Sequence, residues 1–408
     1  MANWVLTKAF REFFDSEKAG GLLLVCCTGV SLIMANSGAG PAWLHFWHTR
    51  IDLSFAGIPL DHPLEYWIND GLMAIFFLLV GLEIERELYI GELADLRQAL
   101  LPIMAAAGGM LVPAVIHYGF NHGQASQSGF GIPMATDIAF ALGVLALLGS
   151  RVPLSARIFL TALAIIDDLG AILVIAFFYT RGLSGVWLAA ALGIFLVLLI
   201  FNRLKINLLA FYCIPGAIMW YCMLRSGIHA TLSGVLLAFA IPFRKGSGAS
   251  PSAARVHSSA TGINPSETLQ HVLHKPVAFI ILPLFALANT GILLTGNWLH
   301  SLGSAGSLGI GAGLIIGKPI GILLFSWLAI RSGLCRLPEE LGWRQLTGLG
   351  ILAGIGFTMS IFITNLAFEQ DNIIRYSKIA ILLASAVAGI LGFISLRAGA
   401  PRMPQKDK

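Results

Sequence analysis

The sequence of 408 residues contains few charged residues. Asp, Glu, Lys and Arg make up 12 % of it, against roughly 25 % in soluble domains. So few charges cannot cover a surface that faces water, which excludes an ordinary soluble enzyme and a disordered chain. Cysteine is scarce as well. The five residues are an odd number and lie mostly in apolar runs, which excludes a disulfide framework and predicts free thiols.

Long uncharged runs dominate what is present. Hydrophobic residues make up 57 % of the chain and the mean hydropathy is +0.81. A membrane-spanning helix needs about 20 apolar residues. The sequence therefore predicts an all-α membrane protein, surrounded by lipid, with about twelve transmembrane helices: 19–36, 66–84, 99–118, 131–149, 157–179, 184–202, 207–224, 227–242, 276–294, 306–329, 346–367 and 377–396.

The distribution of basic residues orients these spans. With the N-terminus inside, 20 of the 26 Lys and Arg residues fall on the inner side and 5 on the outer side. Lys318 alone remains in the middle of a span. This bias follows the positive-inside rule and predicts a multi-pass protein with both termini in the cytoplasm. It also explains the net charge of +5 without nucleic acid as a partner.

Three segments outside the spans have a recognisable character. Residues 1–18 place four apolar side chains near one helical face, which predicts a helix on the inner interface. Alternating apolar residues in 44–60 predict a short outer β-hairpin. Segment 246–266, rich in Gly, Ser, Ala and Pro, predicts a flexible cytoplasmic linker. We expect no second soluble domain, so 1–408 form a single polytopic membrane domain.

Four ionisable residues cannot be placed outside the predicted membrane core: Asp137, Asp167, Asp168 and Lys318. Each costs about 2.5–3.5 kcal/mol at the centre of a bilayer. Such residues are retained when they face a cavity, form pairs or carry the function. A purely structural salt bridge is the alternative, but it does not account for three acids against one base.

Asp167 and Asp168 are adjacent, so their side chains point about 100° apart on a helix and can border one cavity. Two neighbouring carboxylates in a medium of low dielectric resist joint ionisation and titrate as a coupled pair. A proton relieves their repulsion, and so does a cation. The pair therefore predicts competition between protons and a hard cation such as Na⁺ or Li⁺, which prefers oxygen ligands.

Two of the predicted spans contain residues that interrupt a helix. Pro133 precedes Asp137 in 131–149, and four glycines occur within nine residues of 346–367. These are the middle spans of two three-span units, 99–179 and 306–396. Corresponding broken spans are typical of inverted-repeat transporters with a midplane site, although glycine also serves close helix packing. Asp137 could then neutralise opposed helix N-termini, and Lys318 opposed C-termini.

At this point the sequence resembles the NhaA-type sodium/proton antiporter family. Five strings carry the resemblance, in family order over nearly the whole chain: Trp67–Glu83 (WINDGLMAIFFLLVGLE), Ala135–Gly143 (ATDIAFALG), Ala164–Ala171 (AIIDDLGA), Gly317–Pro319 (GKP) and Gly354–Ser360 (GIGFTMS). The resemblance implies an inverted-repeat NhaA-like fold with two discontinuous helices. It also implies a bacterial inner-membrane transporter, not an enzyme, without a cofactor.

The resemblance assigns the site residue by residue. Asp168 matches the principal carboxylate for Na⁺ and protons, with Asp167 as its partner, so a Na⁺ site at Asp167 and Asp168 is implied. Lys318 matches a lysine proposed to pair with that partner, and Thr136 and Asp137 match the unwound stretch beside the site. Family members exchange Na⁺ or Li⁺ for protons at unequal charge, by alternating access.

Regulation and assembly are implied in the same way. The family switches on at alkaline pH and serves pH and sodium homeostasis, and the segment 44–60 matches its homodimer contact. Gln270 departs from the family pattern, in which a glutamate linked to pH sensing is common at this position. The candidate pH-response residues are Glu83, Arg86, Glu87, His229 and Glu267, with His271 and His274 near the same inner mouth. For each of them a structural or solvated role is the alternative; His229 could simply bind a neighbouring helix.

Two other functions also use membrane acids. An intramembrane aspartyl protease would need two aspartates on different spans, which Asp137 and Asp167 could supply, but the third Asp and Lys318 do not suit it. A passive cation channel would need an open pore, usually lined by symmetric subunits. An asymmetric acid cluster between broken helices favours a carrier.

Overall fold

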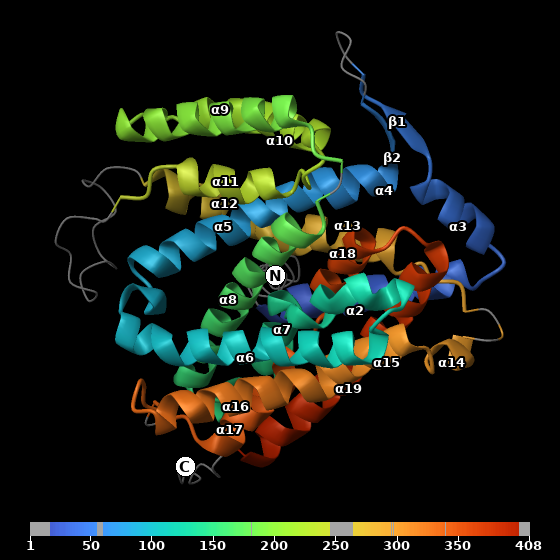
Figure 1. Ribbon diagram of the computed structural model, residues 1–408, viewed down its shortest axis with the longest axis vertical. Coiled ribbons are helices and arrows are strands. Elements are labelled where there is room, and N and C mark those ends of the chain that lie inside the picture. The colour runs from blue at the N-terminus through green and yellow to red at the C-terminus, as the bar shows by residue number, and fades with distance from the viewer. Residues whose placement is uncertain are drawn as a thin grey trace, which may run out of the picture. The chain divides into compact units, whose positions relative to one another are not determined.

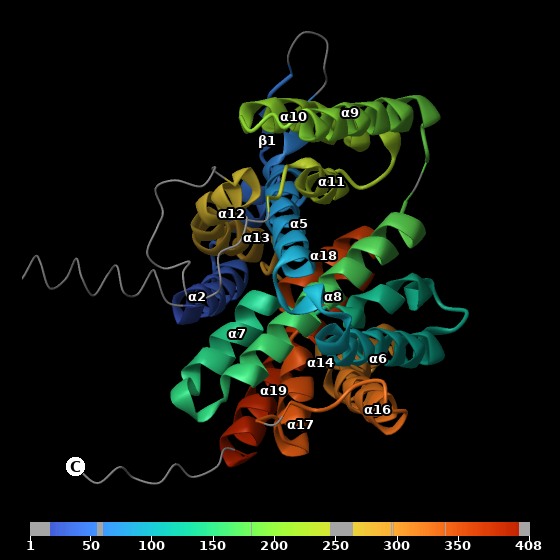
Figure 2. The same ribbon diagram turned by 90° about the vertical axis from the view of Figure 1, so that its left-hand side faces the viewer.

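The computed structural model describes residues 17–54, 60–180, 182–244, 264–294, 296, 298–338 and 340–399. These residues are overwhelmingly helical (Figures 1 and 2). The predicted interfacial helix at 1–18 and the predicted linker at 246–266 lie almost wholly outside them. The chain divides into two compact units. Unit 1 comprises Met1–Ile68, Asp95–Ile175 and Leu282–Lys408, and unit 2 comprises Asn69–Ala94 and Ala176–Ile281.

Unit 1 contains most of the elements. They are α2 (Glu17–Ala35), α3 (Gly40–Trp47), β1 (Arg50–Asp52), β2 (Asp61–Pro63), α4 (Leu64–Tyr66), α6 (Leu96–Asn121), η3 (Ala125–Met134), α7 (Ile138–Leu147), η4 (Gly149–Arg151), nearly all of α8 (Leu154–Phe178), α13 (Leu282–Asn289), α14 (Trp298–Ser301), α15 (Ala305–Ala312), η6 (Gly313–Gly317), α16 (Lys318–Arg331), α17 (Trp343–Ala353), α18 (Phe357–Ala367) and α19 (Asp371–Gly399).

Unit 2 is smaller and is also helical. Its elements are most of η1 (Trp67–Leu72), then α5 (Met73–Tyr89), η2 (Glu92–Ala94), α9 (Gly185–Arg203), α10 (Ala210–Ser226), α11 (Leu232–Ala240), α12 (Pro265–Pro276) and η5 (Val277–Ile281). Within this unit α5 packs against α11 and α12, and α9 packs against α10. Figure 1 shows α9 and α10 in green, side by side.

The predicted spans correspond to helices along the whole described chain. Seven helices are long and apolar enough to cross a membrane, and three further pairs do so if each bent pair is one span. The two remaining predictions, 207–224 and 227–242, correspond to α10 and α11, which have only 17 and 9 residues. Gly227 in the left-handed conformation (φ 85°) ends α10, and Pro242 disfavours helix at Ile241.

The two predicted discontinuous helices are confirmed. η3 and α7 meet at residues 135–137, and α17 and α18 meet at residues 354–356; each pair bends by 44°. The first half of the earlier pair is a 3₁₀ helix that begins at Ala125, not at the predicted residue 131. Gly129, Gly131 and Pro133 lie in this segment, and none of them favours an α-helix.

Small residues bring the helices of unit 1 into close contact. α6 runs beside α16 (Figures 1 and 2), and Gly108 of α6 faces the backbone of Gly321 in α16. A Cβ atom at either position would collide with the carbonyl of the other glycine. Close backbone approach of this kind stabilises helix pairs in membranes, where hydrophobic association is weak. The first predicted three-span unit corresponds to α6, η3–α7 and α8, and the second to α15–α16, α17–α18 and α19. Each unit contains one of the two broken helices.

The predicted hairpin exists, but its bounds differ from 44–60. β1 pairs antiparallel with β2 in the register Arg50↔Pro63, Ile51↔His62 and Asp52↔Asp61. Residues 44–47 belong to α3 instead, because Trp43, Phe46 and Trp47 pack together on that helix. The second strand begins after the predicted end, and residues 55–59 of the predicted hairpin lie outside the described residues.

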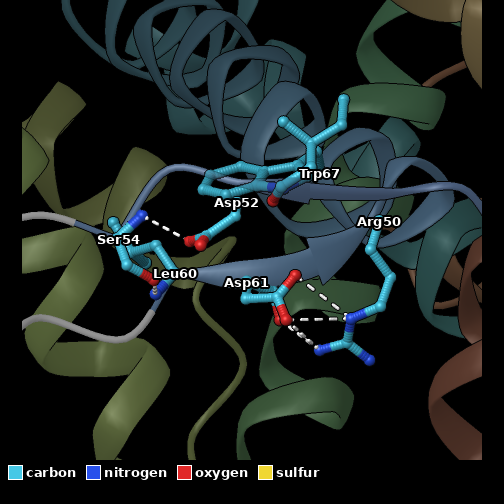
Figure 3. Close-up of polar contacts among 7 residues, drawn as sticks. Arg50, Asp52, Ser54, Leu60, Asp61 and Trp67 are labelled. Atoms are coloured by element: carbon cyan, nitrogen blue, oxygen red, sulfur yellow. Dashed lines mark hydrogen bonds and ion pairs between the residues drawn. The ribbon is translucent and has the colours of Figure 1, made fainter.

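Polar contacts hold the two strands in this register (Figure 3). The guanidinium of Arg50 binds Asp61, with a shortest side-chain distance of 2.9 Å; this hydrogen bond raises the pKa of Arg50. Ser54 donates hydrogen bonds that lower the pKa of Asp52. Trp67 Nε1 donates to the carbonyl of Ile51 at 3.3 Å. These contacts connect β1 to β2 and to the start of the following helix.

The five cysteines are free thiols, as predicted. Many large apolar side chains remain exposed on the helices, for example Phe177 at 78 % and Val186 at 80 %. Exposed apolar surface of this extent is unfavourable in water and is the surface expected toward lipid. The protein is a multi-pass membrane protein.

Candidate functional site

Asp167 and Asp168 lie in the middle of α8, which is an unbroken helix of 25 residues. Both side chains are almost completely buried, with exposures of 0 % and 1 %. α8 carries them among apolar residues, since Ala162, Leu163, Ala164 and Ile165 are buried as well. The two carboxylates are therefore held inside unit 1 and do not point to the lipid face.

The two broken helices are bonded to one another at their breaks. Asp137 N–H donates to the carbonyl of Ile355 at 2.7 Å. The hydroxyl of Thr136 lies 2.9 Å from the carbonyl of Ala353, the last residue of α17. Ser360 Oγ donates to the carbonyl of Ile132 at 2.7 Å. Carbonyl groups of each broken helix are thus bonded by groups of the other one.

Asp137 connects two helix N-termini. It precedes α7, and its Oδ1 accepts the N–H of Phe140 at 2.9 Å, as an N-cap does. Its Oδ2 accepts the N–H of Thr358 at 3.1 Å and also the Thr358 hydroxyl. Thr358 lies in the first turn of α18. One carboxylate therefore faces the partial positive charge of both half-helices.

Lys318 begins α16 directly after the π-helical segment η6. Its Nζ forms an ion pair with Asp167 Oδ2 at 2.6 Å, and both side chains have 0 % exposure. Nζ also donates to the hydroxyl of Thr136, which lies 2.8 Å from the same carboxylate oxygen. Lys318, Thr136 and Asp167 thus form one buried group. The hydroxyl proton of Thr136 can bond either Asp167 or the carbonyl of Ala353, but not both at once.

The charges of this site do not balance. Asp137, Asp167 and Asp168 are three buried acids against the single base Lys318. Lys318 neutralises Asp167 and also interacts electrostatically with Asp168. Asp167 Oδ1 accepts no hydrogen bond from the described protein atoms. The arrangement leaves negative charge that a proton or a monovalent cation can balance, and carboxylate and hydroxyl oxygens to bind it.

The other candidate residues lie in unit 2. Arg86 and Glu87 of α5 form an ion pair at 3.1 Å. Glu83, one turn earlier, is hydrogen-bonded by Gln270 of α12, so the residue that departs from the family pattern contacts a predicted pH-response residue. Glu267 is half-buried on the same helix. These contacts group Glu83, Arg86 and Glu87 on α5, against α12.

His229 has a structural partner. Its Nε2 lies 3.0 Å from the carbonyl of Tyr179, just beyond the end of α8. This hydrogen bond corresponds to the structural role that is the alternative to a pH response.

Several buried polar residues were not predicted. Thr358, in the first turn of α18, donates to Asp137, and Ser385 accepts the N–H of Phe357 at the start of the same helix; only Thr358 belongs to a recognisable motif. Glu85 of α5 is 4 % exposed and accepts a hydrogen bond from Ser266 at 3.0 Å. His117 of α6 is fully buried, and neither of its ring nitrogens has a hydrogen bond from the described part of the chain. A single Ser or His within an apolar run gives no periodicity by which a contact could be predicted.

Comparison with known proteins shows which proteins this chain is similar to. A family model described as Na⁺/H⁺ antiporter 1 matches residues 11–396. A Na⁺/H⁺ antiporter NhaA of Dechloromonas aromatica (strain RCB) is 57 % identical over 393 residues, which cover 96 % of each chain. The NhaA of Flavobacterium psychrophilum is 57 % identical over 392 residues, with 96 % of each chain covered. The NhaA of Proteus mirabilis is 47 % identical over 406 residues, covering 99 % of this chain and all of the relative.

Proposed function

The chain belongs to the Na⁺/H⁺ antiporter 1 family, and we propose that it exchanges cytoplasmic Na⁺ or Li⁺ for external protons electrogenically, by alternating access. The two ions compete for Asp167 and Asp168. The observation that carries the proposal is the buried ion pair between Lys318 and Asp167, next to Asp168 and at the crossing of two broken helices. The relatives of the chain are antiporters, and ion exchange needs no cofactor.

Charge counting supports unequal exchange. With Na⁺ bound and both aspartates ionised, Asp167, Asp168 and the ion sum to −1; with two protons bound they sum to 0. Lys318 adds the same charge to both states if it stays protonated. If Lys318 carries one of the two protons instead, the net charge moved per transport cycle is unchanged. Either way one net charge crosses per cycle, worth about 2.3 kcal/mol per 100 mV.

Vesicles that contain only the purified protein test this function. An inward or outward Na⁺ gradient should drive proton flux that an internal pH dye records, and an imposed membrane potential should change its rate. A channel would conduct in the absence of the counter-ion, whereas an antiporter stalls. Proton movement without Na⁺ would exclude exchange, and exchange that ignores the potential would exclude the unequal stoichiometry.

The inner side of the membrane is the proposed place of pH response. The candidate residues lie on α5 and α12, which are in contact through the Glu83–Gln270 hydrogen bond. They are Glu83, Arg86, Glu87 and Glu267.

The excess of Lys and Arg on one side of the predicted spans supports a location in the inner membrane with both termini in the cytoplasm. In this setting the transporter would serve pH and sodium homeostasis and switch on at alkaline pH.

The hairpin is the proposed homodimer contact. β1 carries exposed residues, including Ile51 at 37 %, and Leu53 just beyond it is 54 % exposed; an exposed strand edge can pair with another chain. Replacing residues 50–63 by a short Gly-Ser segment should convert a dimer into a monomer in native mass spectrometry. Arg50→Ala is the matched control, because one exposed ion pair contributes little. A dimer that survives the replacement would exclude the hairpin as its main contact.

A further inference from the structure

The break before α18 leaves the first N–H groups of that helix without partners of their own. Side chains accept two of them. Phe357 N–H donates to Ser385 Oγ at 3.1 Å, and Thr358 N–H donates to Asp137 Oδ2 at 3.1 Å; the first bond within the helix then runs from Ser360 N–H to the carbonyl of Gly356 at 2.8 Å. The start of α18 is therefore held by one acidic and one neutral side chain, and the neutral one comes from a different helix, α19.

Ser385 is well placed to hold this turn. It is 3 % exposed and lies within the continuous helix α19, which packs against both α17 and α18. The ring of Phe357 packs edge to face on Phe140 of α7, with 5.7 Å between ring centroids. The first residue of α18 is thus fixed on one side by α19 and on the other by the half-helix that Asp137 caps.

A chain of direct contacts leads from this turn to the proposed ion site. Phe357 follows the break residues 354–356, whose Ile355 carbonyl accepts the N–H of Asp137. The carbonyl of Ala353, just before the break, lies 2.9 Å from the Thr136 hydroxyl. That hydroxyl lies 2.8 Å from Asp167 Oδ2. A displacement of the α18 start must therefore change what Thr136 and Asp167 can bind.

We propose that Ser385 is a positioning residue for ion exchange, which fixes the first turn of α18 so that the break presents its carbonyls to Thr136 and Asp137. The inference rests on the proposed function. Without the Ser385 hydroxyl, the buried N–H of Phe357 loses its acceptor. The turn then unwinds or moves toward the remaining acceptor, Asp137, and the break moves with it. Ser385 itself touches no transported ion.

Ser385→Ala tests this role in vesicles with Na⁺-driven proton flux as the readout. We expect the apparent KM for Na⁺ to rise about fivefold, the size of a typical N-cap loss at 1.4 kcal/mol per tenfold change. The pH profile of the flux should shift as well, because protons compete at the same carboxylates. Ser385→Thr keeps the hydroxyl and should stay within about twofold of the native KM. Ser377→Ala is the matched control, a buried serine of the same helix.

Each outcome has a defined meaning. A native KM and pH profile in Ser385→Ala would overturn the proposal, even if the thermal unfolding midpoint falls, since a fall alone indicates a structural role. If Ser385→Ala fails to reach the membrane, Ser385→Cys supplies a weaker acceptor and should raise the KM by an intermediate factor; no rise would again overturn it. Absence of exchange in the unmutated protein would instead refute the proposed function.

Discussion

Asp168→Asn is expected to abolish Na⁺-driven proton flux while the protein still folds and inserts. Lys318 neutralises Asp167 through the 2.6 Å ion pair, and the N-termini of α7 and α18 compensate Asp137. Under the proposed function, Asp168 is one of the two carboxylates for which Na⁺ and protons compete, and its side chain is 1 % exposed. Asn has nearly the same shape but carries no charge and takes up no proton. Neither Na⁺ nor a proton therefore has a negative charge to neutralise at this position. The measurement is flux in vesicles at matched protein content.

Asp371→Asn serves as the control for this variant. Asp371 is an exposed acid at the start of α19, so its neutralisation changes the net charge equally but should leave the flux near the native value. Asp167→Asn should also impair exchange, since it removes the partner of Lys318. Native transport by both Asp167→Asn and Asp168→Asn would mean that the ions bind elsewhere.

Lys318→Ala is expected to have the second-largest effect, and primarily on stability. The substitution leaves the fully buried Asp167 without its cation, and loss of one partner from a buried ion pair costs about 3–5 kcal/mol. The thermal unfolding midpoint of the purified protein should therefore fall strongly. Combining Lys318→Ala with Asp167→Asn removes the orphaned charge, and the double variant should regain part of the lost stability.

Flux measurements on the same variants separate the two possible roles of Lys318. Loss of stability with retained, electrogenic exchange would make the lysine a structural partner of Asp167. Exchange that becomes insensitive to the membrane potential would instead indicate that Lys318 carries a transported proton. If the double variant were as unstable as Lys318→Ala, the unpaired carboxylate could not be the cause.

The membrane-buried charges were predictable from the sequence because they are costly. Four charged residues interrupt apolar runs: Asp137, Asp167, Asp168 and Lys318. Because placing a charge in lipid costs energy, such residues are rare in membrane spans and can be recognised from the sequence alone. The broken helices were predictable for a similar reason, because Pro133 and the glycines of 346–367 disfavour helix locally. The extents of short elements were not: α11 is far shorter than its apolar run, and β2 lies beyond the predicted hairpin.

Hydropathy, helix breakers and the bias of Lys and Arg are properties of neighbouring residues, and they determined that this chain is a helical, multi-pass membrane protein with acids inside it. The partners of those acids depend on packing between distant segments. Lys318 and Asp167 are 151 positions apart, and Thr136 and Ala353 are 217 apart. The sequence predicted that Asp137 meets helix N-termini and that Lys318 pairs with Asp167; only the tertiary structure decided which atoms meet, and that Ser385 holds the start of α18, because a hydrogen bond depends on distance in space and leaves no local pattern in the chain.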